Sequence, residues 1–500
     1  MLRSSFFQGL ATLLSRISGL LRDVIAAQYL GASRISDCFF IAFKIPNTVR
    51  KMIGEGPLSS TFMPIFTKVY SNSKNEAQLL SGRILVILLT ITTSLVLLGE
   101  IFTPQLIYYI APGIRSNHDA YIKAIMLTRI SLPYMIMVTT VALLGAINNG
   151  LGKFFSLGFT PAILNITMSA ALLILTNTYN IEPGLALIIG TSIGGINQLI
   201  FMIIATTRAG CLPKFSAKAS PVAKKSVKKF FSSLAPILFT QGLFQINTFI
   251  DNIFASMEAK VPSFLYYSNR LSQFAVSIIG HTLGIVVLSK LTQLLARKLT
   301  KEASACYRDA IIAGAALSIP AAFGIYLLSS QLIQIIYERG NFLPEDTAHV
   351  AKMLQIASVA IPFCVINKIQ YSALYAKSKF LLSLRIGVIT IAVNFFINIS
   401  LFRVIPIYYI VISTTIAIMV ECTLLSIYIH RNNIFRNTFY CFRAVALSLL
   451  YSCIMFAVAS YVQTALTHLP ILINILATMV SAGIVYVALV YASKAYFKKE

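Results

Sequence analysis

The residues of this chain that could do chemistry are ionisable side chains inside long apolar segments. Segments 9–30 and 36–64 carry the first set, which consists of Arg16, Arg22, Asp23, Asp37, Lys44 and Arg50. Later apolar segments add Arg129, Asp251 and Arg270. Each charge at the centre of a membrane helix costs roughly 2.5–3.5 kcal/mol on insertion scales. We therefore expect these side chains to face one another or a polar cavity rather than lipid.

Basic residues outnumber acidic residues in the first set. Arg16 and Asp23 are seven residues apart, hence on one face of a helix, and so are Asp37 and Lys44. A surplus of buried positive charge requires an anion, and the guanidinium fork suits phosphate oxygens and stays protonated when desolvated. The pattern predicts a central cationic cavity for a phosphate-bearing substrate. The alternative for Asp23, Asp37 and Arg129 is that ion pairs hold the helices together.

Pro46 interrupts segment 36–64. Proline has no backbone N–H and clashes with the preceding turn, so it frees carbonyls and is expected to bend the helix at midspan. Beyond the bend follow the polar residues Asn47, Arg50, Lys51 and Glu55.

The sequence lacks the signatures of several other chemistries. It contains no Walker loop, no GxGxxG, no nucleophile elbow and no metal-ligand spacing among its dispersed histidines. Its seven cysteines are scattered, which favours small core-facing residues over a disulfide or metal framework. We therefore expect a protein that is not an enzyme and does not use ATP.

Composition identifies the elements that position these residues. The chain is 57% hydrophobic and only 11% charged, whereas soluble domains carry about 25% charged residues. Apolar runs of membrane-spanning length predict an all-α polytopic membrane protein with about fourteen transmembrane helices. The expected spans are 9–30, 36–64, 81–110, 122–147, 157–178, 184–207, 229–256, 264–290, 308–337, 348–376, 380–402, 406–430, 442–464 and 469–494.

Loop charge tests this count. Lys and Arg concentrate in alternate connections, such as 208–229 and 290–308, while the intervening connections hold few. By the positive-inside rule the number of spans is even and both termini are cytoplasmic. The net charge of +25 therefore comes from cytoplasmic loops, and no nucleic-acid partner is expected.

The long basic connection divides the expected domains. We predict an N-lobe over 1–207, a cytoplasmic linker over 208–228 and a C-lobe over 229–430. Residues 431–500 supply two further helices and a cytoplasmic tail. The architecture expected is thus two six-helix lobes followed by a C-terminal pair.

Several motifs carry a family resemblance. The stretch SRISGLLRDVIAAQYLGAS, followed by DCFFIAFKIPNTVRKMIGEGPLSSTFMP, resembles the N-terminal signature of the MurJ (MviN) lipid II flippases. LTRISLPY, GAINN, PAILNI and YYSNRL are similar to further motifs of that family. The family belongs to the superfamily of multidrug, oligosaccharidyl-lipid and polysaccharide exporters.

The resemblance implies a transporter in the bacterial inner membrane. Its substrate would be lipid II, the undecaprenyl-pyrophosphate-linked disaccharide-pentapeptide, which moves from the inner to the outer leaflet by alternating access. The expected substrate-binding residues are Arg16, Arg22, Arg50, Arg270, Lys44 and Asn47. The expected gate or ion-pair residues are Asp23, Asp37, Glu55 and Arg129. The last two spans would form a groove for the lipid tail. Asn269 departs from the family, which often has aspartate before the arginine of YYSNRL.

A sodium site is a further expectation, because some family members bind sodium in the C-lobe. Asp251, Asn394, Asn398 and Thr414 offer hard oxygen ligands, and a backbone carbonyl near Ile410 could complete the set. The alternative is that Asn394 and Asn398 form helix-packing hydrogen bonds. No other cofactor is expected.

Three other functions stay open. A flippase for another undecaprenyl-linked glycan differs only in fine motif detail. A small-molecule antiporter for cationic drugs would need an acidic, aromatic cavity, which is the reverse of the pattern here. A membrane enzyme acting on polyprenyl phosphates would need a catalytic histidine or paired carboxylates, and His281 and His349 have no such neighbours in sequence.

Overall fold

The computed structural model describes residues 2–54, 57–215, 221–377, 379–432, 434–435 and 439–493. Every regular element within these ranges is helical, which confirms the predicted all-α class. The chain forms two compact units. Unit 1 comprises Met1–Ser263 and Arg339–Phe342, and unit 2 comprises Phe264–Glu338 and Leu343–Glu500.

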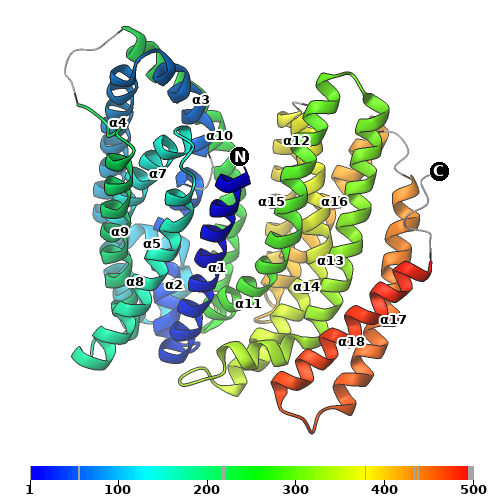
Figure 1. Ribbon diagram of the computed structural model, residues 1–500. Helices are drawn as coiled ribbons and strands as arrows, with labels where there is room; N and C mark the ends of the chain where they lie inside the picture. The colour runs from blue at the N-terminus through cyan, green and yellow to red at the C-terminus, as the bar shows by residue number, and fades with distance from the viewer. Residues whose placement is uncertain are drawn as a thin grey trace. The chain divides into compact units, whose positions relative to one another are not determined.

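Unit 1 holds the helices coloured blue to green in Figure 1. They are α1 (Leu2–Leu30), α2 (Arg34–Val49), α3 (Pro57–Asn72), α4 (Lys74–Ile101), α5 (Thr103–Ile110), α6 (His118–Ser131), α7 (Tyr134–Gly150), α8 (Phe155–Tyr179), α9 (Pro183–Arg208) and α10 (Pro221–Ala255). A π-helical turn, η1 (Arg50–Gly54), follows α2, and a 3₁₀ turn, η2 (Pro112–Ser116), follows α5.

Unit 2 holds the remaining helices, apart from the first residues of α11. They are α11 (Val261–Val276), α12 (Thr282–Ala296), α13 (Thr300–Tyr337), α14 (Pro344–Ala376), α15 (Phe380–Leu401), α16 (Tyr409–Arg431), α17 (Phe439–Ala465) and α18 (Ile471–Ala492). A π-helical turn, η3 (Ser277–His281), joins α11 to α12. Helix α14 packs against α13 and α16, and α17 packs against α13 and α18.

In the described residues, eleven helices are long and apolar enough to cross a membrane. The predicted spans 9–30, 36–64 and 229–256 are not among them, although α1, α2 with α3, and α10 are helical there. Charges lower the hydropathy of these segments, since α1 contains Arg16, Arg22 and Asp23, α2 contains Asp37 and Lys44, and the first nine residues of α10 include four lysines. With these three included, the helices match the fourteen predicted spans.

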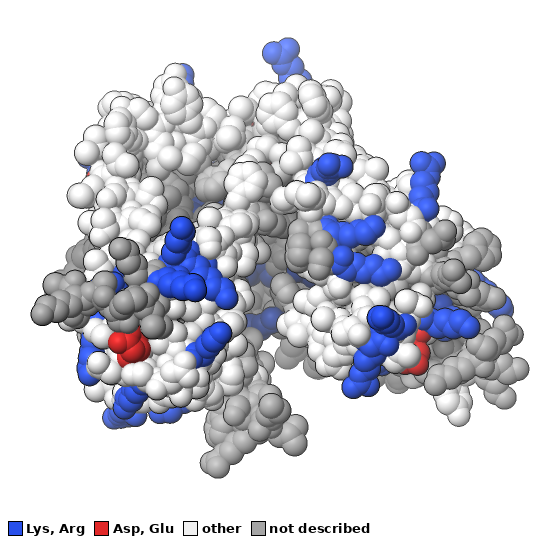
Figure 2. Space-filling model, turned by 90° about the horizontal axis from the view of Figure 1, so that it is seen from above, with Lys and Arg blue, Asp and Glu red and all other residues white. Residues whose placement is uncertain are grey.

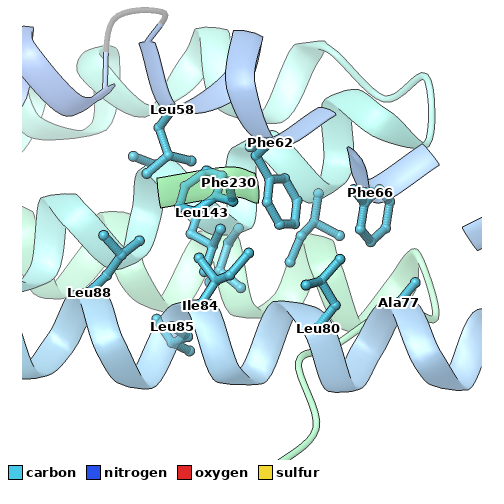
Figure 3. Close-up of a cluster of buried hydrophobic side chains, with 14 of the residues drawn as sticks. Leu58, Phe62, Phe66, Ala77, Leu80, Ile84, Leu85, Leu88, Leu143 and Phe230 are labelled. Carbon is cyan, nitrogen blue, oxygen red and sulfur yellow. The ribbon is translucent and has the colours of Figure 1, made fainter. Parts of the chain in front are cut away.

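Helix α10 packs in unit 1, although the sequence places its span at the start of the C-lobe. Phe230 of α10 is fully buried against α3, where its ring meets that of Phe62 edge-on at 6.0 Å. Figure 3 shows Phe230 among side chains of α3, α4 and α7, including Leu80 and Leu143. The compact units therefore divide after Ser263 rather than at the basic linker.

The interruption of the second span lies just beyond Pro46. Helix α2 continues to Val49 before it changes to the π-helical turn η1. Proline cannot donate a hydrogen bond to the carbonyl four residues earlier, which is that of Ala42. The hydroxyl of Ser131, on α6, donates to this carbonyl at 3.3 Å. A neighbouring helix thus satisfies the backbone group that Pro46 leaves free, as a membrane interior requires.

Candidate functional site

Arg22 is bound by protein groups on α1 and α8. Its Nη2 lies 2.6 Å from Oδ1 of Asp23, and its Nη1 donates to Oδ1 of Asn165 at 3.1 Å. Asn165 in turn donates to the carbonyl of Ser15 at 3.3 Å. Arg22 and Asp23 are 8% and 1% exposed, so this is a buried, hydrogen-bonded ion pair. Asp23 therefore lies in an ion pair, and its partner is the adjacent residue.

Arg16 differs from Arg22, which lies six residues further along α1. Its side chain is half-buried. Among the described residues, its guanidinium has no hydrogen-bond or ion-pair partner. Arg16 is therefore a cation in an apolar helix whose charge no described carboxylate neutralises at close range.

Asp37 caps a helix from a distance. Its Oδ2 accepts the backbone N–H of Lys260 at 2.8 Å, and its Oδ1 accepts the backbone N–H and the hydroxyl of Ser263 at 3.1 and 2.5 Å. The N–H groups in the first turn of a helix have no partner within the helix, and a carboxylate there also meets the positive end of the helix dipole. Asp37, which is 1% exposed, fixes the start of α11.

Lys44 joins α2 to α10. Its ammonium donates to Oδ1 of Asn252 at 2.7 Å and to the carbonyl of Thr248 at 3.3 Å. The carboxylate of Asp251 also stabilises the ammonium electrostatically. The face shared by Asp37 and Lys44, as their seven-residue spacing predicts, therefore contacts the end of α10 and the start of α11.

Two further predicted residues meet at the end of α2. Arg50 begins the π-helical turn, and its Nε donates to Oδ1 of Asn47 at 3.0 Å. Both side chains are half-buried. Glu55, predicted at the gate, lies outside the described residues.

Arg129 and Arg270 lie on other helices, α6 and α11. Arg129 is exposed on α6, where it acts electrostatically on Glu100 of α4. Arg270 is half-buried on α11 in unit 2, and Asn269 before it is exposed.

The residues predicted for sodium belong to different units. Asp251 lies in unit 1, whereas Asn394, Asn398 and Thr414 lie on α15 and α16 of unit 2. The amide of Asn398 donates to Oδ1 of Asn394 at 3.0 Å, and both residues are fully buried. Oδ1 of Asn398 is buried and has no hydrogen-bond partner among the described residues. This orphaned acceptor suits a hard cation, since buried polar groups are usually satisfied.

Sequence reasoning did not single out Asn165, Asn252 or Ser263, the partners of the buried charges. Asn165 lies within the PAILNI motif, whose polar residue in an apolar run could have marked it. Asn252 follows Asp251 directly, and Ser263 stands at the start of α11. The spacing of these residues from their charged partners gives no indication of contact.

The comparisons with known proteins agree on one fold and one family. A solved structure described as "Lipid II flippase MurJ, inward closed conformation" superimposes with a TM-score of 0.81 and 26% identity, covering 98% of this chain and 99% of the other. An inward-facing multidrug resistance MATE transporter of the MOP superfamily matches with a TM-score of 0.70 over 84% of this chain and 94% of its own. At 12% identity, that second likeness shows the fold alone. The chain is thus an all-α polytopic membrane protein with the MOP transporter fold.

Sequence comparison identifies the family within this class of transporters. The family model "Lipid II flippase MurJ" matches residues 26–481. A "Probable lipid II flippase MurJ" from Rickettsia prowazekii is 33% identical, over 83% of this chain and 81% of its own length. Its counterpart from Haemophilus influenzae is 31% identical, over 77% and 78%. The chain belongs to the MurJ lipid II flippase family, which confirms the resemblance seen in its motifs.

Proposed function

We propose that this chain carries lipid II from the inner to the outer leaflet of the bacterial inner membrane by alternating access. The relatives named above are described as lipid II flippases. The observation that supports a role for particular residues is the half-buried guanidinium of Arg16, which has no hydrogen-bond or ion-pair partner in the described part of the chain. The diphosphate of lipid II supplies the anion that this cation lacks, and guanidinium binds phosphate oxygens in bidentate fashion.

We assign different roles to the basic residues of α1 and α2. Arg16 and Arg50 bind the diphosphate directly, since both side chains are half-buried and guanidinium groups suit phosphate oxygens. Arg22 positions α1 against α8, because Asp23 and Asn165 already hold its guanidinium. Lys44 contributes to the substrate-binding charge only after its bonds to α10 rearrange. For Arg270 the family motif alone supports a role.

Transport in this proposal has no chemical step. The substrate shifts the equilibrium between two conformations only through its different affinity for each of them. The hydrocarbon tail stays in lipid along α17 and α18, whose exposed apolar side chains include Leu449, Ile484 and Val487. A sodium ion at Asn394 and Asn398 is a second part of the proposal, supported by the orphaned carbonyl of Asn398.

The orientation proposed places both termini in the cytoplasm. Lys and Arg side chains gather on the face of the units seen in Figure 2, where few Asp and Glu are visible. The basic connections that predict this orientation include exposed Lys74 and Arg208 in unit 1, and exposed Arg297 and Lys301 in unit 2. Cysteine labelling of these connections in inside-out vesicles tests the assignment, and labelling from the periplasmic side only would reject it.

The function is tested in liposomes that contain labelled lipid II. We expect Arg16→Ala and Arg50→Ala to abolish the appearance of the label in the opposite leaflet, with Arg16→Lys intermediate because lysine lacks the planar fork. Arg297→Ala, an exposed arginine at the end of α12, is the matched control and should transport normally. Normal transport by both alanine variants would refute direct binding of the diphosphate by Arg16 and Arg50. Recovery of chemically altered lipid would instead favour an enzyme.

A complementation assay gives an independent readout. Arg50→Ala or Arg270→Ala should insert normally but fail to support growth of a strain depleted of its own lipid II flippase. Full growth from both variants would show that neither guanidinium is needed for transport.

A further inference from the structure

Glu421 is a carboxylate near the middle of an apolar helix that the transport model leaves unused. It is the only acidic residue in the sequence of α16, Tyr409–Arg431. An ionisable residue within a membrane-spanning helix is expensive and commonly marks a functional site. Glu421 lies between α16 and α14, and both of these helices belong to unit 2.

Neutral groups of α14 hold both carboxylate oxygens. The hydroxyl of Tyr371 donates to Oε1, and Nδ2 of Asn367 donates to Oε2 at 2.8 Å. In the part of the chain that the structure describes, no lysine or arginine forms an ion pair with Glu421. A charge kept in an apolar span without a counter-ion is costly, so the protonated acid is a competitive state.

The same neighbours can serve the protonated acid. A protonated carboxyl group donates one hydrogen bond and therefore needs an acceptor. Oδ1 of Asn367 is buried and, among the described residues, has no hydrogen-bond partner. Turning the Asn367 amide about its terminal bond exchanges its oxygen with Nδ2, which places that acceptor beside Oε2. The turn gives up the long hydrogen bond that Nδ2 donates to the carbonyl of Ile418 at 3.4 Å, and in exchange Glu421 has a hydrogen-bond partner in either protonation state.

Among the ionisable groups around Glu421, the carboxyl group itself is the one expected to gain or lose a proton near neutral pH. The neighbouring ionisable groups are Tyr371, Tyr375, Cys364 and Lys368 on α14, and Cys422 on α16. Lys368 instead contacts Nε2 of His281 at 3.1 Å. The only ionisable residue of α15, Arg385, is exposed. Tyrosines and thiols normally titrate well above neutral pH.

We propose that Glu421 is a proton-binding site whose occupancy biases the conformational equilibrium of the transporter. The proton adds to Oε2 of the carboxylate, the Asn367 amide turns to accept it, and its loss reverses both changes. The ring of Tyr375 stacks on that of Tyr371 at 6.1 Å, which fixes the ring whose hydroxyl donates to Oε1 of Glu421. The coupling to transport rests on the proposed function, whereas the proton site itself does not.

Infrared difference spectroscopy tests the site without any substrate. In reconstituted protein, we expect a C=O stretch of a protonated carboxylic acid that shifts in heavy water and disappears as the pH is raised. Glu421→Gln should remove the band, and Asn367→Leu or Tyr371→Phe should shift its frequency. Glu182→Gln is the matched control, because Glu182 is half-buried but ion-paired with Lys123 at 2.5 Å, and it should leave the band unchanged. A band that persists in Glu421→Gln, or no band at any pH where the protein stays folded, overturns the proposal.

Transport under an imposed pH gradient tests the coupling. Wild-type protein should move labelled lipid II at a rate that changes several-fold with the direction of the gradient, and Glu421→Gln should lose that dependence. Wild-type transport that ignores the gradient refutes the coupling. If wild-type protein moves no lipid II at all, the proposed function fails, and the infrared result still decides the proton site.

Discussion

Replacing Asp37 with asparagine should loosen the start of α11 by an amount that follows from its hydrogen bonds. Oδ1 accepts two donors from Ser263, and Oδ2 accepts the backbone N–H of Lys260 at 2.8 Å. Asparagine keeps one acceptor oxygen. With this oxygen directed at Ser263, the new amide nitrogen faces the N–H of Lys260, so two donors oppose each other.

The loss of free energy in Asp37→Asn has two parts. The variant loses one hydrogen bond to a charged acceptor, worth about 1.5–3 kcal/mol. It also loses a negative charge at a helix N-terminus, worth about 0.3–2 kcal/mol. The free energy of opening the first turn of α11 should therefore fall by about 2–5 kcal/mol, a roughly 30- to 4,000-fold change at 1.4 kcal/mol per factor of ten.

Hydrogen–deuterium exchange of the reconstituted protein measures this change directly, because amide exchange reports local opening. A peptide covering Lys260–Ser263 should exchange faster in Asp37→Asn by that factor. Asp119→Asn, at an exposed position in the first turn of α6, is the control and should leave the peptide unchanged. Unaltered exchange in Asp37→Asn would refute the capping role. Equal acceleration by both variants would show a general loosening instead.

Three further predictions concern the stability of unit 1. Arg22→Ala should destabilise this unit by about 3–5 kcal/mol, because the buried carboxylate of Asp23 loses its cation. The melting midpoint in detergent should fall, and an unchanged midpoint would contradict the pairing. Phe62→Ala should cost about 3–5 kcal/mol through the cavity it leaves in the core, read by the same measurement. Gly31→Ala should expose the segment 339–342 to protease, since Gly31 has φ +59° and a Cβ there would lie 2.1 Å from the carbonyl oxygen of Asn341; unchanged cleavage would refute this.

Hydropathy and charge along the chain were sufficient to predict the helical class and the approximate number of spans. A span needs about 20 apolar residues, whichever neighbours it later meets, so spans such as 157–178 and 184–207 coincide closely with α8 and α9. The charged positions of α1 and α2 were also visible, because a lysine or arginine in an apolar run is conspicuous in the sequence itself. Helical periodicity placed Asp37 and Lys44 on a common face, and both contact the α10–α11 region.

The partners of those charges were decided only by the tertiary structure. Arg22 meets Asn165, 143 residues away, and Asp37 meets Ser263, 226 residues away. Neutral partners of this kind carry no charge to attract notice, and their approach depends on how the helices pack rather than on spacing along the chain. The placement of α10 has the same origin, because a buried apolar contact such as that of Phe230 is non-directional and its partner cannot be identified from one sequence.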